Sequence, residues 1–205
     1  MSNKRLIYLM RHGEIMTEKH VRRYIGQIDI PLSQEGIRQA LLVQTLLANQ
    51  EFSAVFCSDL MRSVATARII TEHVTVSPTI RRDLREISMG EWEGKTFKEI
   101  EQLYPTEYVE RGKNIVNYHI PGGENFADCQ TRILAAFADL LNTSDGTILI
   151  VGHAGINRII LCYILGMPLE NIFRLTQDYG CMNILVADKN QYHIKLLNGL
   201  PTPGV

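Results

Sequence analysis

The hydrophobic pattern of the chain begins with an apolar run over residues 6–10, whose β-branched and aromatic members predict a short buried strand. The polar tetrapeptide Arg11-His12-Gly13-Glu14 follows it directly. A guanidinium and an imidazole are therefore expected at the carboxyl end of this strand. Ligands bind at that edge of open α/β sheets, and a glycine lets the backbone turn sharply or approach a ligand closely. This strand end is the first candidate site.

A second apolar stretch, residues 52–57, predicts another strand that ends in polar residues. Ser58 and Asp59 follow it and are expected to cap a helix over residues 60–73. Arg62 lies one turn into that predicted helix. Its side chain is therefore expected near the end of the second strand.

Residues 147–151 form the most strand-like run of the chain. Because this run does not alternate between apolar and polar side chains, we expect it to be buried on both faces of a parallel sheet. His153 stands at its end, and a helix is expected over residues 156–165. Parallel strands share one edge of their sheet, so the polar groups that follow these strands are expected to converge.

The remaining periodicities continue an alternation of strands and helices that is typical of an α/β fold. Ser33 is expected to cap the helix between the first two strands. We expect one domain over residues 1–205, with helices flanking a mostly parallel sheet. Further helices are expected over 34–49, over 97–103 with a weak continuation to 111, and over 126–141; further strands are expected at 74–76, 173–176, 182–187 and 192–197, the last two as a hairpin through 188–191.

Two charged segments without a clean period, residues 15–31 and 81–94, are interpreted as loops that face a ligand. Residues 15–30, together with residues 97–119, are expected to shape the pocket for the group that a reaction releases. Neither segment contains a pattern that identifies the substrate.

Composition and charge narrow the function classes. Of 205 residues, 45% are hydrophobic, which suffices for a sizeable core. The formal charge of −1, from 21 Lys and Arg against 22 Asp and Glu, gives no global basic field, so neither nucleic acid nor a membrane is an expected partner. The apolar run near the N-terminus is too short for a signal peptide or a membrane span, and the cysteines lack any Cys-x-x-Cys spacing. We therefore expect a cytoplasmic protein with reduced cysteines.

Two histidines at strand ends, with arginines nearby, indicate phosphate chemistry. Arginine offers a planar fork that matches phosphate oxygens, and Arg11 and Arg62 are placed to supply it. Histidine can act as a covalent nucleophile. A carboxylic acid is then needed to protonate the leaving oxygen and to activate water. Glu86 is the best placed by context, with Glu14 and Glu93 as alternative acids.

A metal site made of His12, His153 and Asp59 is disfavoured, because the two nearby arginines would repel a cation. The chain contains neither a Walker-type glycine-lysine loop nor a dinucleotide glycine fingerprint. We therefore expect no metal and no cofactor.

The chain resembles the histidine phosphatase superfamily, also called the phosphoglycerate mutase-like family, in five motifs that occur in order between residues 4 and 165. The resemblance implies a three-layer α/β sandwich in which His12 becomes phosphorylated. It also implies that Arg11, Arg62 and His153 bind the phosphoryl group and that Glu86 is the acid and base. The motifs are Arg11-His12-Gly13-Glu14; Pro31-Leu32-Ser33 with Gly36; Cys57-Ser58-Asp59-Leu60-Met61-Arg62-Ser63 with Thr66-Ala67; Leu84-Arg85-Glu86 with Gly90 and Trp92-Glu93-Gly94; and Gly152-His153-Ala154-Gly155.

Two further residues are expected to bind substrate. Arg23 begins a segment similar to the family's Arg-aromatic-x-Gly pattern, although displaced by about one residue, and Ser58 stands at a strand end. Residues 15–18 depart from the family, which often has Asn or Trp-Asn there. The Pro-Gly-Gly-Glu segment at 121–124 is similar to the short phosphatases, including α-ribazole phosphatases, whereas the mutases carry a longer insertion.

These features favour a metal-independent phosphomonoesterase that acts on a small phosphorylated metabolite. A cofactor-dependent phosphoglycerate mutase and a non-catalytic phospholigand-binding protein stay as alternatives. The physiological substrate and the oligomeric state stay open, with a homodimer among the alternatives.

Overall fold

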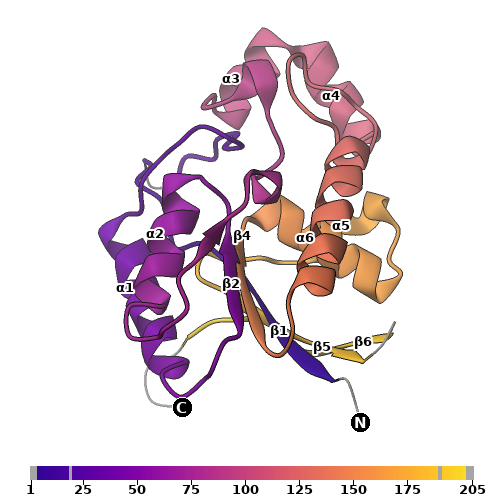
Figure 1. The fold of residues 1–205 in the computed structure, drawn as a ribbon. Helices are drawn as coiled ribbons and strands as arrows, with labels where there is room; N and C mark the ends of the chain where they lie inside the picture. The colour runs from indigo at the N-terminus through magenta and orange to yellow at the C-terminus, as the bar shows by residue number, and fades with distance from the viewer. Residues whose placement is uncertain (1–3, 19, 189–190, 202–205) are drawn as a thin grey trace.

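The computed structural model describes residues 4–18, 20–188 and 191–201, which form a six-stranded sheet in the order β3-β2-β4-β1-β5-β6 (Figure 1). The first four strands run parallel to one another, and β5 and β6 pair antiparallel. This order sets β1, β4 and β2 side by side in the middle of the sheet. The strands are β1 (Arg5–Arg11), β2 (Ala54–Cys57), β3 (Thr79–Ile80), β4 (Ile148–Gly152), β5 (Met182–Asp188) and β6 (Gln191–Gly199).

Helices cover both faces of the sheet, which gives the three-layer α/β sandwich that the sequence predicts (Figure 1). One face carries α1 (Gln34–Leu46) and α2 (Met61–Ile70), and the other carries α5 (Phe126–Thr143) and α6 (Ala154–Leu165). In the described part of the chain, no helix is both long and apolar enough to cross a membrane. The short elements are α3 (Phe97–Leu103), α4 (Pro105–Lys113), η1 (Arg82–Leu84), η2 (Gly90–Trp92) and η3 (Leu169–Arg174).

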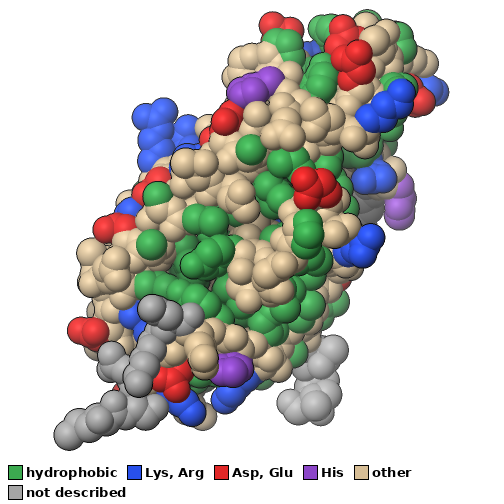
Figure 2. Space-filling view, turned by 90° about the vertical axis from the view of Figure 1, so that its right-hand side faces the viewer, with side chains coloured by type: hydrophobic (Ala, Val, Ile, Leu, Met, Phe, Trp, Pro, Cys, Tyr) green, Lys and Arg blue, Asp and Glu red, His purple; other side chains and the backbone are tan. Residues whose placement is uncertain are grey.

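The outer side of the α5 and α6 layer carries hydrophobic side chains. Figure 2 shows them gathered across the face that lies to the right in Figure 1. The exposed large hydrophobic residues of α6 and η3 include Tyr163, Leu165 and Phe173. The inner side of the same layer packs on the sheet.

The interiors of the central strands β1 and β4 are apolar, and both of their faces are covered. In β1, Ile7 and Leu9 pack with the α5 and α6 layer, whereas Tyr8 and Met10 pack with the α1 and α2 layer. Successive strand residues point to opposite faces of a sheet. All five residues of β4 are buried. The uninterrupted apolar runs therefore correspond to strands buried on both faces, as predicted.

Side-chain caps fix where several helices begin. Ser33 accepts a hydrogen bond from the backbone nitrogen of Gly36 and caps α1, as predicted. Thr96 and Glu99 exchange hydrogen bonds in a capping box that starts α3. The N-cap of α5 is Asn125. α3 covers the expected residues 97–103, while α1 and α2 end about three residues before their predicted ends.

Two predicted strands are wrong. Residues 173–176 form no strand; η3 covers Leu169–Arg174 instead, and its buried residues Leu169 and Ile172 are three positions apart, which is the period of a 3-10 helix. Residues 74–76 lie in a turn and the chain that leaves it, and β3 starts only at Thr79. The expected hairpin exists as β5 and β6, although residues 189–190 of its turn lie outside the described residues.

The predicted cap of α2 is also wrong. The N-cap is Leu60, whose own side chain makes no capping hydrogen bond, and Asp29 Oδ1 accepts from the backbone nitrogen of Met61 at 2.8 Å. Ser58 and Asp59 are occupied by partners from other parts of the fold: Ser58 contacts His153, and Asp59 pairs with Arg85.

Two glycines bring the segment after β1 into direct contact with α1. A Cβ atom on Gly13 would collide with the backbone of Gly36, and a Cβ atom on Gly36 would collide with the backbone of Glu14. The backbone nitrogen of Gly13 also donates a hydrogen bond to Thr66 Oγ1. The backbone beside His12 is therefore fixed by contacts that a larger side chain would prevent.

Candidate active site

The structure brings the polar ends of β1 and β4 together. Arg11 pairs with Gly152 across the parallel ladder, and the backbone nitrogen of His12 donates to the carbonyl oxygen of Gly152 at 3.1 Å. The imidazole rings of His12 and His153 follow these strand ends, with centroids 5.0 Å apart. Both histidines are buried. The convergence expected from the strand pattern is present.

Hydrogen bonds assign the proton on the His12 ring. Nδ1 lies 2.7 Å from the carbonyl oxygen of Gly13, and a carbonyl can only accept, so Nδ1 carries the hydrogen. Nε2 then keeps its lone pair, and it accepts from Arg62 Nε at 3.2 Å. This is the tautomer in which Nε2 can act as a nucleophile.

Arg62 is buried and is anchored by backbone carbonyls. Its Nη1 donates to Ile28 at 2.8 Å and its Nη2 to Gly26 at 2.6 Å. The first turn of α2 and the loop before α1 therefore fix the guanidinium together. The loop over residues 15–31 thus orients a residue of the site, in addition to its place at the cavity described below.

His153 is the N-cap residue of α6, and its ring is held from behind by Ser58. Ser58 Oγ lies 2.7 Å from His153 Nε2 and is itself fully buried. His153 Nδ1 is buried and has no hydrogen-bond partner among the described residues, and the same is true of Arg11 Nε. Buried polar atoms without partners are rare, and they mark places where a bound group can supply the missing bond.

Burial and positive neighbours keep both imidazoles neutral. Burial lowers the pKa of His12 well below 6.5, and the charges of Arg11 and Arg62 lower it further. Burial is also the main cause of the lowered pKa of His153, with His12, Arg62 and Arg11 adding to it. At neutral pH the site therefore holds two uncharged rings between two permanent cations.

Glu86 is seated on the N-terminus of α6. Its Oε2 accepts from the backbone nitrogen of Gly155 at 2.8 Å, and its Oε1 accepts from Ile156 at 3.2 Å and Ile87 at 3.0 Å. A Cβ atom on Gly155 would lie 2.5 Å from Oε1, so a glycine is needed there for the close approach. The N-terminus of α6 thus positions both Glu86 and His153.

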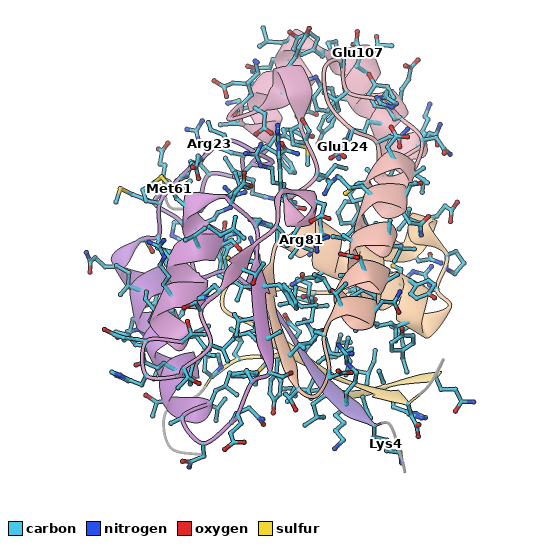
Figure 3. The ribbon with its side chains drawn as sticks, viewed as in Figure 1. Lys4, Arg23, Met61, Arg81, Glu107 and Glu124 are labelled. Atoms are coloured by element: carbon cyan, nitrogen blue, oxygen red, sulfur yellow. The ribbon has the colours of Figure 1, made fainter. Side chains whose placement is uncertain are left out.

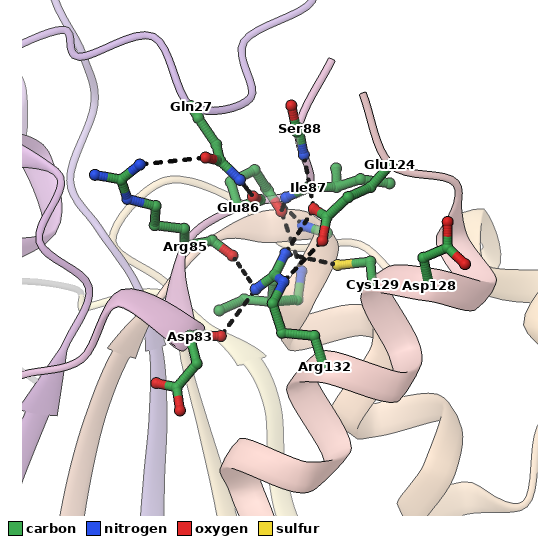
Figure 4. A network of polar contacts seen from close by, with 12 residues as sticks. Gln27, Asp83, Arg85, Glu86, Ile87, Ser88, Glu124, Asp128, Cys129 and Arg132 are labelled. Atoms are coloured by element: carbon green, nitrogen blue, oxygen red, sulfur yellow. Dashed lines mark hydrogen bonds and ion pairs between the residues drawn. The ribbon is translucent and has the colours of Figure 1, made fainter. Parts of the chain in front are cut away.

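A half-buried ion pair brackets the loop that carries Glu86 (Figure 4). On one side, Arg132 Nη1 donates to the carbonyl oxygens of Asp83 at 2.8 Å and Arg85 at 3.0 Å. On the other side, Glu124 accepts from the backbone nitrogen of Ser88 at 3.0 Å. Arg132 and Glu124 bind each other at 2.7 Å. The Pro-Gly-Gly-Glu segment therefore has a structural task beside the site.

A cavity of about 910 Å³ opens beside Arg11. Arginines outnumber carboxylates in its lining, which includes Arg22, Arg23 and Arg158 together with Glu14 and Glu18. Figure 3 shows Arg23 at the end of the molecule where α3 lies, with Lys4 at the opposite end. A space of this size accommodates a small organic group beside a phosphate.

The two other residues expected to bind substrate lie in different places. Arg23 lines the cavity, where it bonds the carbonyl oxygen of Gly94 and pairs with Glu18. Ser58 lies behind His153 and does not line this cavity. In the described part of the chain, no group of three or more His, Cys, Asp or Glu side chains is arranged to hold a metal ion.

Sequence reasoning missed the segment 177–180, which closes one side of the site. The carbonyl oxygen of Gln177 accepts from Arg11, the ring of Tyr179 stacks under Arg11, and the backbone nitrogen of Gly180 donates to His12. The one local signal is an aromatic residue before a glycine at a turn between two predicted strands. Such a signal does not tell a site residue from an ordinary turn.

The chain is similar to known proteins in both sequence and fold. The family description "Histidine phosphatase superfamily (branch 1)" matches residues 7–199. The chain is 30% identical over 199 residues to an adenosylcobalamin/alpha-ribazole phosphatase of Salmonella typhimurium, a match that covers 94% of this chain and 95% of the relative. It is 36% identical over 167 residues to the "Probable phosphoglycerate mutase GpmB" of Yersinia pestis, covering 79% and 75%. The crystal structure of the alpha-ribazole phosphatase from Shigella flexneri matches with a TM-score of 0.86 at 28% identity, over 95% of this chain and 96% of that one.

Because His12 and His153 are neutral in the folded protein, the stability of the fold is expected to depend on pH. The unfolded chain protonates these imidazoles below about pH 6.5, where the folded protein keeps them neutral, so the unfolded state binds more protons. Stability is therefore expected to fall as the pH drops below 6.5, by up to about 1.4 kcal/mol per pH unit and per histidine. The free energy of unfolding, measured by urea denaturation between pH 5 and 7.5, tests this expectation. The His12→Asn, His153→Asn double variant should give a flatter curve, and parallel curves would contradict the assignment.

Proposed function

Because the chain belongs to the histidine phosphatase superfamily, we propose that it is a metal-independent phosphomonoesterase that hydrolyses a small phosphorylated metabolite through a phosphohistidine on His12. The observation that carries this proposal is the state of His12. Its Nδ1 hydrogen is held by Gly13, and its Nε2 lone pair lies beside the Arg62 guanidinium. A neutral nucleophile next to fixed cations suits attack on a phosphate ester.

In the first step, His12 Nε2 attacks phosphorus in line with the leaving oxygen. A nitrogen–phosphorus bond forms while the phosphorus–oxygen ester bond breaks. Arg11, Arg62 and His153 stabilise the three equatorial oxygens, on which charge is spread in such transfers. Arg11 Nε and His153 Nδ1, which lack partners in the described residues, are proposed to donate to these oxygens. Glu86 gives its proton to the leaving alkoxide.

In the second step, a water molecule attacks the phosphohistidine. The Glu86 carboxylate takes a proton from this water, the nitrogen–phosphorus bond breaks, and inorganic phosphate leaves. His12 returns to its neutral form and Glu86 to its acid form. The seat of Glu86 on the N-terminus of α6 keeps its position fixed relative to His153 in both steps.

Ser58 is proposed to act on the substrate through His153. A serine hydroxyl that donates to Nε2 leaves the ring hydrogen on Nδ1, where a phosphoryl oxygen can accept it. Arg23 is proposed to contact the leaving group, since it lines the cavity beside Arg11. The relatives named alpha-ribazole phosphatases support a substrate of that kind, a phosphate ester on a compact organic group.

We place this reaction in the cytoplasm and assign it no nucleic-acid or membrane partner and no cofactor. The balanced composition, with a formal charge of −1, supports the absence of a polyanion partner. The four cysteines, all described, are buried free thiols, which suits a reducing compartment.

Removing the nucleophile tests the proposal. His12→Ala is expected to abolish hydrolysis of a generic phosphomonoester such as p-nitrophenyl phosphate, because it removes the imidazole nitrogen that is proposed to accept the phosphoryl group. EDTA is expected to leave the wild-type rate unchanged. Phosphate release and acid-labile protein-bound phosphate are the measurements. Full activity in His12→Ala would refute the mechanism, and full loss in EDTA would refute metal independence.

Leaving groups of different basicity test Glu86. Glu86→Gln is expected to lower kcat/KM for an alkyl phosphate by about 10²–10⁴-fold, the usual contribution of a general acid. The loss should be smaller for p-nitrophenyl phosphate, whose phenolate leaves without a proton. Glu93→Gln and Glu14→Gln are the matched comparisons for the alternative acids. The same loss for both esters would contradict the acid role in the first step.

The relative named as a phosphoglycerate mutase favours one alternative activity. With 3-phosphoglycerate and a trace of the 2,3-bisphosphate, a phosphatase releases phosphate, whereas a mutase forms the 2-phospho isomer without net release. We expect phosphate release, and phosphorus NMR of the mixture distinguishes the two. Binding of phosphate esters without either product would identify a non-catalytic binding protein.

A further inference from the structure

Arg11 is oriented by two contacts from the segment that joins η3 to β5. Its guanidinium carbon lies 3.6 Å from the centroid of the Tyr179 ring. Its Nη1 donates to the carbonyl oxygen of Gln177 at 2.7 Å. The stacking fixes the plane of the guanidinium, and the hydrogen bond fixes its rotation within that plane. Arg11 Nε is buried without a partner among the described residues.

Tyr179 is itself held in place by the anchoring of its two neighbours. Asp178 and Asn198 exchange hydrogen bonds of 2.8 and 2.7 Å, which tie the segment to β6. On the other side, the backbone nitrogen of Gly180 donates to the carbonyl oxygen of His12 at 3.0 Å. The Tyr179 ring also lies 5.6 Å from the His12 ring. The anchors therefore connect the position of Tyr179 to the backbone of His12.

A neutral aromatic face differs from a carboxylate as a partner for arginine. A carboxylate orients the guanidinium but cancels its charge, whereas a ring orients it and leaves the charge available. In the described residues, Arg11 belongs to no ion pair. Arginine recognises a phosphate with a planar fork, so the plane of the guanidinium determines which oxygens it reaches.

We propose that Tyr179 is a positioning residue that holds Arg11 in the plane in which its fork meets the phosphoryl oxygens. This inference rests on the proposed function, in which Arg11 binds the phosphoryl group. Without the ring, Arg11 samples other planes and must be ordered when the ligand binds, which weakens binding. The simpler explanation is that the Tyr179 ring only fills space beside the cavity.

Two substitutions separate these explanations. Tyr179→Phe keeps the aromatic face, and Tyr179→Leu keeps an apolar side chain but removes the face. The probe is orthovanadate, measured as its inhibition constant against p-nitrophenyl phosphate. Tyr179→Leu is expected to raise this constant about tenfold, within the range of a desolvated cation–π contact, and Tyr179→Phe is expected to restore it to within about twofold of the wild-type value. Tyr163→Leu, on the exposed side of α6, is the matched control and should change nothing.

A double-mutant cycle with Arg11 completes the test. In an Arg11→Met background, Tyr179→Leu is expected to change the inhibition constant less than about twofold, because no guanidinium is left to orient. A tenfold effect that persists in this background overturns the proposal, as does an equal loss in Tyr179→Phe and Tyr179→Leu. The melting temperature of each variant shows whether it is folded. Activity in His12→Ala would instead refute the proposed function, so the two failures are distinguishable.

Discussion

The site depends on two guanidinium cations that are oriented without being neutralised. Arg62 donates to the carbonyl oxygens of Gly26 and Ile28, and Arg11 donates to that of Gln177. Neither takes part in an ion pair within the described residues. Carbonyl dipoles fix the direction of a donor but leave its full charge in place. That charge helps to keep both histidines neutral, and it is the charge that a phosphoryl group would meet.

Two other arginines near the site have carboxylate partners and brace the loop of Glu86. Arg85 pairs with Asp59, and Arg132 pairs with Glu124. These pairs tie the loop of Glu86 to the end of β2 and to α5, so the loop is fixed from both sides (Figure 4). Arginine thus has two roles near the site, and the two roles differ in the group that accepts its hydrogen bonds. The two arginines beside His12 thus have neutral acceptors, whereas the two that brace the loop have carboxylates.

The sequence predicts the strands and helices that carry the site better than it predicts the side-chain contacts within the site. The buried strands and the amphipathic α5 follow from local patterns, and the strand ends predict where His12 and His153 meet. Ser58 was expected to cap a helix, but its partner His153 lies 95 positions away in the chain. Tyr179 escaped detection for the same reason, since Arg11 is its partner and no periodicity connects the two. Long-range pairs of polar side chains leave no local pattern.

The buried residues of the site and most of the residues that line the cavity come from different parts of the chain. His12, Glu86 and His153 are carried by strand ends, a braced loop and the start of α6, whereas much of the cavity lining belongs to residues 15–25. That loop includes residues 15–18, where the sequence departs from its family. Side chains among residues 15–25 therefore shape much of the cavity, whereas the strand ends, the braced loop and the start of α6 hold His12, Glu86 and His153. The shape of the cavity and the placement of the buried site residues are thus encoded in separate stretches of the chain, which meet where Gly26 and Ile28 hold Arg62.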